Sequence, residues 1–196
     1  MKRIWQGIVW LALFISASVA WATDYTVDKD HSTVEFSVRH LFSNVKGTCD
    51  DFEGTFSYVP GTPGDWKARA TVNVASINTH QPKRDAHLKS KDFFEVDTYP
   101  TMKFVSTGVT NVTPTSATLN GLLTIHGVEK PVVFDLEIRG EGKDPWGNLR
   151  SGFSATTTIN RKDFGIIWNQ TLETGGVLVG DEVKITLEIE GIAQAS

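Results

Sequence analysis

The chain has 196 residues, of which 40% are hydrophobic and 21% are charged, and its formal net charge is −4. This is enough sequence for one domain with a core, and it is too apolar for a disordered chain. A single cysteine excludes a disulfide scaffold and a thiolate metal cluster, and the lack of a basic run gives no reason to expect nucleic-acid binding.

The first 22 residues have the pattern of a secretory signal peptide. Lys2 and Arg3 precede an almost wholly apolar stretch over 4–15, and Ala20-Trp21-Ala22 has the small-x-small form of a cleavage site. The alternative is a membrane anchor, but this stretch is shorter than the roughly 20 residues that span a bilayer. We therefore expect cleavage after Ala22, export to the periplasm, and a single domain over 23–196.

Most of the chain after residue 32 alternates apolar and polar side chains with a period of two. The alternation is clearest over Thr33–His40, 132–139, 153–159 and 182–190, and further candidates are 52–58, 68–77, 101–109 and 117–125. One apolar and one polar face per strand is typical of an antiparallel sheet. The spacing predicts an all-β barrel or sandwich of about eight strands, with 83–94 as a short helical segment that crosses between strands.

A closed barrel of this size either fills its interior with side chains or holds a small ligand. The predicted inward faces carry Phe and Val but also small residues such as Ala70, Gly121 and Ala155, so a filled core and an apolar cavity both remain open. Strand parity predicts which side chains face the interior and would line such a cavity. They are Val34, Phe36, Val38, Phe52, Phe56, Val72, Val74, Phe104, Leu119, Leu123, Phe134, Leu136 and Phe153.

Catalytic signatures are lacking in the sequence. It contains no G-x-S-x-G, H-E-x-x-H or nucleotide-binding motif, and its five histidines have no spacing that predicts a metal site. Asp28 and Asp30 beside His31 are either an acid–histidine pair or ordinary polar residues where a strand begins. Arg84-Asp85-Ala86-His87 is either a polar gate that meets a ligand headgroup or a cluster that fixes the helical segment.

Several motifs, in order along the chain, resemble the YceI family. They are His31-Ser32-x-Val34-x-Phe36-x-Val38-Arg39-His40-Leu41, Phe52-x-Gly54-x-Phe56, Ser76-Ile77-x-Thr79, Arg84-Asp85-x-His87-Leu88-x-Ser90-x-Asp92-Phe93-Phe94, Tyr99-Pro100, Gly121-x-Leu123-Thr124-Ile125-x-Gly127-Val128-x-Lys130-Pro131-Val132, Asp144-Pro145-Trp146-Gly147 and Asn160-Arg161-x-Asp163-Phe164-Gly165-Ile166. The resemblance covers roughly residues 25–192. One position departs from it, since Cys49 stands where the family usually carries an aromatic residue.

The resemblance implies an extended, lipocalin-like antiparallel barrel of eight strands. It implies a periplasmic carrier or store whose tunnel holds a polyisoprenoid, an isoprenoid quinone or a similar long-chain amphiphile, with no other cofactor and no nucleic acid. An enzyme that acts on a lipid at the tunnel mouth and a stress-response partner protein without a ligand are the alternatives. A homodimer and transient contact with inner-membrane proteins are left open. We expect the polar residues of the mouth to be His31, Arg84, Asp85, His87 and Arg161.

Overall fold

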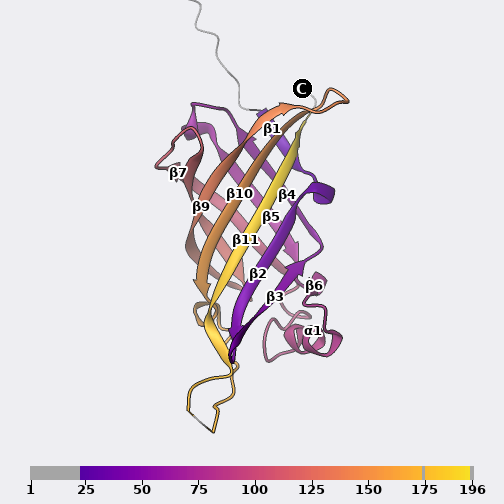
Figure 1. Cartoon of the computed structure of the whole chain (residues 1–196), viewed down its shortest axis with the longest axis vertical. Coiled ribbons are helices and arrows are strands. Elements are labelled where there is room, and N and C mark those ends of the chain that lie inside the picture. The colour runs from indigo at the N-terminus through magenta and orange to yellow at the C-terminus, as the bar shows by residue number, and fades with distance from the viewer. Residues whose placement is uncertain (1–22, 174, 195–196) are drawn as a thin grey trace, which may run out of the picture.

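The computed structural model describes residues 23–173 and 175–194, and the predicted signal peptide over 1–22 lies outside these residues. One sheet, closed on itself, forms the molecule, with helix α1 (Pro82–Lys89) beside one end (Figure 1). Its strands are β1 (Thr23–Val27), β2 (Thr33–His40), β3 (Ser43–Cys49), β4 (Phe52–Tyr58), β5 (Lys67–Asn73), β6 (Ile77–Asn78), β7 (Thr101–Thr110), β8 (Ser116–Ile125), β9 (Val128–Lys143), β10 (Leu149–Asn160) and β11 (Val179–Ala193). Within the described residues, no helix has the length and apolar character needed to cross a membrane.

The eleven segments make an eight-stranded antiparallel barrel because three of the long strands are interrupted. β1 and β2 both pair with β11, at Val27↔Gly191 and Thr33↔Glu188, so they are two halves of one strand. In the same way, β3 and β4 are two halves of one strand, and so are β5 and β6. β3 pairs with β2 and β6, while β4 pairs with β1 and β5. The all-β barrel predicted from the alternation is therefore confirmed, although β1 and β3 were not among the predicted strands.

The third interruption, between β5 and β6, leaves the barrel wall incomplete near α1. After β5, the 3-10 turn Val74–Ser76 leads into β6, which pairs with β3. β7 pairs with β5 from Thr101 onward, and no pairing joins β6 to β7 among the described residues. Helix α1 and residues 90–100 lie in this part of the chain, beside the lower ends of the strands in Figure 1. The helical segment predicted here thus lies at one end of the barrel.

Helix α1 is shorter than the predicted segment 83–94 because polar groups cap it at both ends. At the start, Pro82 occupies the first turn and the Gln81 side chain accepts a hydrogen bond from the Arg84 amide. At the end, the Ser90 hydroxyl donates to the His87 carbonyl at 2.8 Å and accepts from the Asp92 amide at 3.3 Å. These local bonds compete with the helical backbone pattern, so the chain leaves the helix after Lys89.

The interior consists of two hydrophobic clusters at opposite ends of the barrel. The cluster at the β1 end is aromatic and closely packed: Tyr25, Phe56, Tyr58, Trp66 and Phe153 make ring contacts with centroids 4.8–5.4 Å apart. The bare backbone of Gly191 makes room there, since a Cβ would lie 2.5 Å from the Phe56 ring. The cluster at the α1 end contains Leu123, Ile125, Phe134, Ile159, Phe164 and their neighbours.

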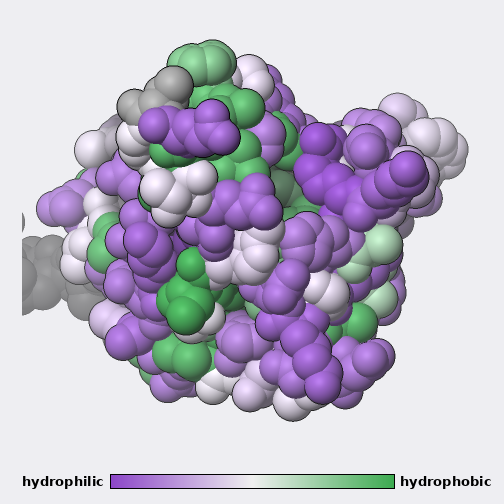
Figure 2. Space-filling view, turned by 90° about the horizontal axis from the view of Figure 1, so that it is seen from below, coloured by the Kyte–Doolittle hydropathy of each residue, from purple (hydrophilic) through white to green (hydrophobic). Residues whose placement is uncertain are grey.

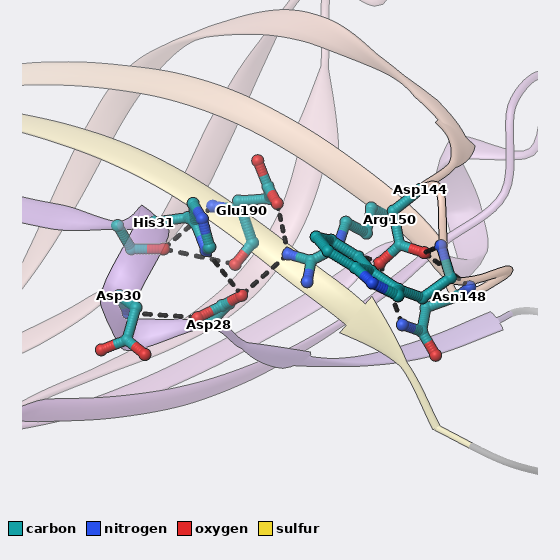
Figure 3. Close-up of polar contacts among 9 residues, drawn as sticks. Asp28, Asp30, His31, Asp144, Asn148, Arg150 and Glu190 are labelled. Carbon is teal, nitrogen blue, oxygen red and sulfur yellow. Dashed lines mark hydrogen bonds and ion pairs between the residues drawn. The ribbon is translucent and has the colours of Figure 1, made fainter.

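An ion-pair cluster on the outer surface closes the break between β1 and β2 (Figure 3). The 3-10 turn Lys29–His31 bulges out of the strand, and the Ser32 hydroxyl replaces the missing strand pairing by bonding both the amide and the carbonyl of Glu190. Beside it the Arg150 guanidinium contacts Asp28 at 2.7 Å, Asp144 at 2.8 Å and Glu190. Arg150 holds the pKa values of the Asp28 and Asp144 carboxyls well below their usual range.

We predict that Arg150→Ala lowers the melting temperature at pH 7 by several degrees, because three clustered carboxylates lose their common cation. A lowered carboxyl pKa adds stability above the unfolded-state pKa of about 4, and this contribution is lost as the pH falls through the folded-state value. The difference between wild type and variant should therefore be largest above about pH 5 and should narrow in stronger acid. Melting curves from pH 7 down to pH 2 measure it, and a difference that is independent of pH would contradict this role of Arg150.

Candidate functional site

A cavity of about 350 Å³ occupies the α1 end of the barrel. Its wall is formed by the inward faces of β2 and β11, by α1 and the residues after it, and by the segment 164–168 that follows β10. The lining is almost entirely apolar, with Phe36, Leu88, Phe94, Ile166 and Ile185 among its members. Seen from this end, the surface is mostly polar, with separate apolar groups between the polar side chains (Figure 2).

Three of the predicted lining residues surround this cavity: Val34, Phe36 and Val38, all on β2. The other ten are placed elsewhere in the structure, which corrects the predicted lining. Phe104, Leu119, Leu123, Phe134 and Leu136 belong to the cluster at the α1 end without facing the cavity, Phe56 and Phe153 belong to the aromatic cluster at the β1 end, Phe52 and Val74 are buried, and Val72 is half-buried. The reason is physical: parity determines the face of a strand, but neighbouring side chains determine whether the space in front of that face is filled.

Arg161 is a buried residue at the cavity, and its side chain binds the backbone of neighbouring segments. Its side chain is 5% exposed, and its guanidinium donates to the carbonyl oxygens of Gly180, Ile166 and Trp168 at 2.7–2.9 Å. Burial lowers the pKa of this guanidinium, while Asp181, 3.4 Å away, acts in the opposite direction. Because its donors are directed at backbone carbonyls, Arg161 fixes the segment that carries Ile166 and Trp168 against the cavity.

Arg84 and Asp85 both bind Thr79, which supports the interpretation of their motif as a cluster that fixes the helical segment. Arg84 donates to the hydroxyl of Thr79 at 2.7 Å and to its carbonyl at 2.8 Å. Asp85 accepts from the amide of Thr79 at 2.9 Å and from its hydroxyl. Thr79 is 4% exposed, so these contacts anchor α1 to the end of β6. Arg84 also borders the cavity, whereas Asp85 is not part of its lining.

His87 belongs to an aromatic contact that covers the cavity from outside the barrel. Its ring meets Phe93 and Trp168 edge-on, with centroids 5.0 and 4.9 Å apart, and its Nε2 lies 2.8 Å from Asp92 Oδ2. This joins α1 to the segment after β10, which is far away in sequence. Sequence reasoning did not identify Trp168, because it lies in an irregular segment where no alternation indicates which way a side chain points.

His31 does not lie at the mouth of the cavity, which corrects its predicted place. Its side chain is 59% exposed on the turn between β1 and β2, and its Nδ1 lies 2.9 Å from Asp28 Oδ2 (Figure 3). Asp28, His31 and Glu190 offer ligand atoms within 4.8 Å of one another, but Arg150 already supplies a positive charge to both carboxylates. The nearby Ser32 hydroxyl is engaged by the Glu190 backbone. The acid–histidine pair is therefore part of the ion-pair cluster.

Cys49 is a buried part of the cavity wall. Burial, together with the neighbouring Asp50 carboxylate, raises the pKa of its thiol to about 12. The side chain therefore stays a neutral thiol at physiological pH and is a poor nucleophile.

The YceI-like domain model matches residues 25–191. A UPF0312 protein of Pseudomonas savastanoi is 45% identical over 169 residues, which are 85% of this chain and 88% of that protein.

Among solved structures, the Campylobacter jejuni YceI protein has a TM-score of 0.69 and 28% identity over 96% of this chain and all of that chain. A polyisoprenoid binding domain from Saccharophagus degradans has a TM-score of 0.64 and covers 87% of this chain and 98% of its own; at 16% identity it shows the fold alone. The match of the family model spans nearly all of the described barrel, and the chain belongs to the YceI family.

Proposed function

We propose that this protein binds a long-chain isoprenoid, such as a polyprenyl chain or an isoprenoid quinone, with the apolar chain in the cavity. The observation that carries the proposal is the cavity of about 350 Å³ with an almost wholly apolar wall at one end of a closed barrel. An apolar cavity with few polar groups selects for an apolar ligand. The polyisoprenoid binding domain of Saccharophagus degradans, which shares the fold, supports this class of ligand.

Burial of the apolar chain supplies the driving force. An isoprenoid segment exposes a few hundred Å² of apolar surface in water, and at about 25 cal/mol per Å² its burial offers several kcal/mol. Association and ordering of the chain cost part of this energy. Three polar groups of the wall have protein partners, since Arg84 binds Thr79, Arg161 binds backbone carbonyls and His87 lies beside Asp92. The ligand's headgroup is therefore expected to stay at the opening, in contact with water.

The geometry favours binding over the two alternatives. An enzyme would need an activated nucleophile at the cavity, but the pKa of the Cys49 thiol is raised. Arg84, His87 and Arg161, which the sequence offered as polar residues of the mouth, have protein partners. A structural partner protein with a filled core would not need the cavity, which remains open between well-packed regions. The cavity lies within a single chain, so binding does not require a dimer.

Export to the periplasm is part of the proposal and is supported by the signal-peptide pattern of residues 1–22. The protein that accumulates in the periplasm of an expressing bacterium should begin at Thr23. Intact-mass measurement on the periplasmic fraction tests this, and a mature species that still carries Trp21 would contradict the cleavage site.

Filling the cavity should abolish binding without unfolding the protein. Val183 lies in the cavity wall beside Val38, its cross-strand partner on β2, and Val183→Phe places a larger apolar side chain in the cavity. We expect the affinity for farnesol, a prenyl alcohol, to fall at least about tenfold, while the melting temperature stays the same or rises because apolar volume is filled. Fluorescence competition with an apolar dye measures the affinity.

The matched control for this variant is Val105→Phe, which makes the same change on the outer face of β7, where Val105 is 54% exposed. It should bind like wild type. Unchanged affinity in a folded Val183→Phe protein would contradict binding in this cavity.

Arg84 should act on stability rather than as a headgroup contact. Arg84→Ala removes two hydrogen bonds from the buried Thr79, which should lower the free energy of unfolding by about 1–3 kcal/mol. Affinity for prenyl alcohols should change only a few-fold. Chemical denaturation measures the stability, and Lys83→Ala, at an exposed cationic neighbour on α1, serves as the control. A large loss of affinity with unchanged stability would instead make Arg84 a headgroup contact.

A further inference from the structure

We propose that the α1 end of the barrel docks on an anionic lipid bilayer, with the side chains of Phe42 and Ile167 inserted between the lipids. Phe42 lies in the turn between β2 and β3, and Ile167 lies in the segment that follows β10. The ends of these strands lie at the lower end of the molecule in Figure 1, together with α1. The proposal goes beyond the ligand of the cavity and is tested without it.

Phe42 and Ile167 are unusually exposed for large apolar residues. Among the large apolar side chains of the described residues, Phe42, Trp146 and Ile167 are the most exposed, at 100%, 81% and 69%. A single exposed side chain of this kind is common on protein surfaces and needs no explanation. Phe42 and Ile167, however, lie at the same end of the barrel, which is also the end that holds the apolar cavity.

Both exposed side chains stand at the edge of this cavity. Ile167 lies between Ile166 and Trp168, and both of these residues line the cavity. Phe42 lies two residues after His40, which is also part of the lining. A bilayer that contacts this end of the barrel therefore meets the exposed side chains next to the cavity, and their transfer out of water favours the contact.

The β2–β3 turn holds Phe42 outward in a fixed geometry. His40 and Ser43 pair across the turn, and the Leu41 amide donates to the Leu178 carbonyl at 2.9 Å. Leu41 has a left-handed φ of 50°, which is uncommon for a bulky residue and costs free energy. A strained turn that displays an aromatic ring to solvent is typical of an element that contacts a partner.

The distribution of charge selects an anionic surface as this partner. Segments 36–49 and 159–184, which carry Phe42 and Ile167, contain five Lys or Arg and four Asp or Glu. The rest of residues 23–196 contains twelve Lys or Arg and nineteen Asp or Glu. Anionic headgroups thus repel most of this acidic molecule, and an approach with these two segments in front avoids the repulsion.

Two cations of the β2–β3 hairpin are placed to meet the headgroups. Arg39 and Lys46 are exposed, and no acidic residue occurs between 36 and 49. Asp181 lies near Arg39 but already pairs with Lys162 at 2.9 Å and with Arg161 at 3.4 Å. The Arg39 guanidinium itself donates to the Leu41 carbonyl at 3.3 Å, which leaves further donors for lipid phosphates.

The test is co-sedimentation of the chain over 23–196 with lipid vesicles. Vesicles of phosphatidylethanolamine with a quarter phosphatidylglycerol provide the anionic surface, and vesicles of phosphatidylcholine provide the neutral one. We expect wild type to bind the anionic vesicles more tightly than the neutral ones. Phe42→Ala and Ile167→Ala should each weaken binding to the anionic vesicles by about fivefold or more, because each removes apolar area from the contact. The melting temperature should stay unchanged, since both side chains are exposed.

Matched controls lie at the opposite end of the barrel. Trp146→Ala removes an exposed aromatic side chain from the turn between β9 and β10, near β1 in Figure 1, and should leave vesicle binding unchanged. Lys46→Glu should abolish the preference for anionic vesicles. Lys143→Glu makes the same change at an exposed residue near the end of β9 and should keep the preference.

The outcomes separate this proposal from others. Wild type that binds neither kind of vesicle, or Phe42→Ala and Ile167→Ala proteins that bind like wild type, would overturn docking by this end. A loss in Trp146→Ala equal to that in Phe42→Ala would overturn the choice of end. A dimer in gel filtration that Phe42→Ala dissociates, without vesicle binding, would assign the surface to a second copy of the chain instead. Failure of prenyl-alcohol binding with intact vesicle binding would contradict the proposed function alone.

Discussion

The interior volume of a closed eight-stranded barrel is the constraint on which the rest of this structure depends. Closure fixes how much space the strands enclose, and each part of that space is either filled by side chains or left for a ligand. At the β1 end, five aromatic residues fill it with ring-to-ring contacts. At the α1 end, the inward residues do not fill the interior, and a cavity of about 350 Å³ remains. Dense packing at one end thus makes binding at the other possible without loss of the fold.

The interruptions in three of the strands serve this division. The break between β1 and β2 is sealed by Ser32 and Arg150, so the wall stays closed there. The break between β5 and β6 is not sealed by strand pairing, and α1 lies at this end. Helix α1 is fixed through Thr79 and through the contact of His87 with Trp168. The cavity is therefore bounded partly by strands and partly by segments held by side-chain contacts, which are easier to open than a hydrogen-bonded wall.

Much of the fold could be predicted from the sequence, because alternation is a local property. Thr33–His40 and 52–58 match β2 and β4, and the antiparallel arrangement follows from their one-sided apolar faces. β1 and β3 were missed because Thr23–Val27 is short and Ser43–Cys49 carries few large apolar residues. The end of α1 depends on hydrogen bonds of a single serine, which the helical spacing does not reveal.

The candidate site was less predictable, because it depends on contacts between distant segments. Val34 and Phe104 both face inward by parity, yet only Val34 borders the cavity, since the ring of Phe104 packs against Phe134. Trp168 reaches the cavity from an irregular segment that Arg161 fixes through backbone carbonyls. His31 stands in a motif of the family but lies on the outer surface, where its partner is Asp28. The local alternation thus indicates which face of a strand is inward, whereas packing between distant segments determines which inward residues border the cavity.

The most direct measurement is methyl NMR on the protein mixed with farnesol, read through nuclear Overhauser contacts between ligand and protein. If the apolar chain lies in the cavity, contacts should appear with methyl groups of Val34, Val183 and Ile185. Contacts should be absent for Val109 and Ala193, which pack against the aromatic cluster at the β1 end. Contacts with Val109 and Ala193, or contacts with outer-face methyl groups alone, would contradict binding in this cavity.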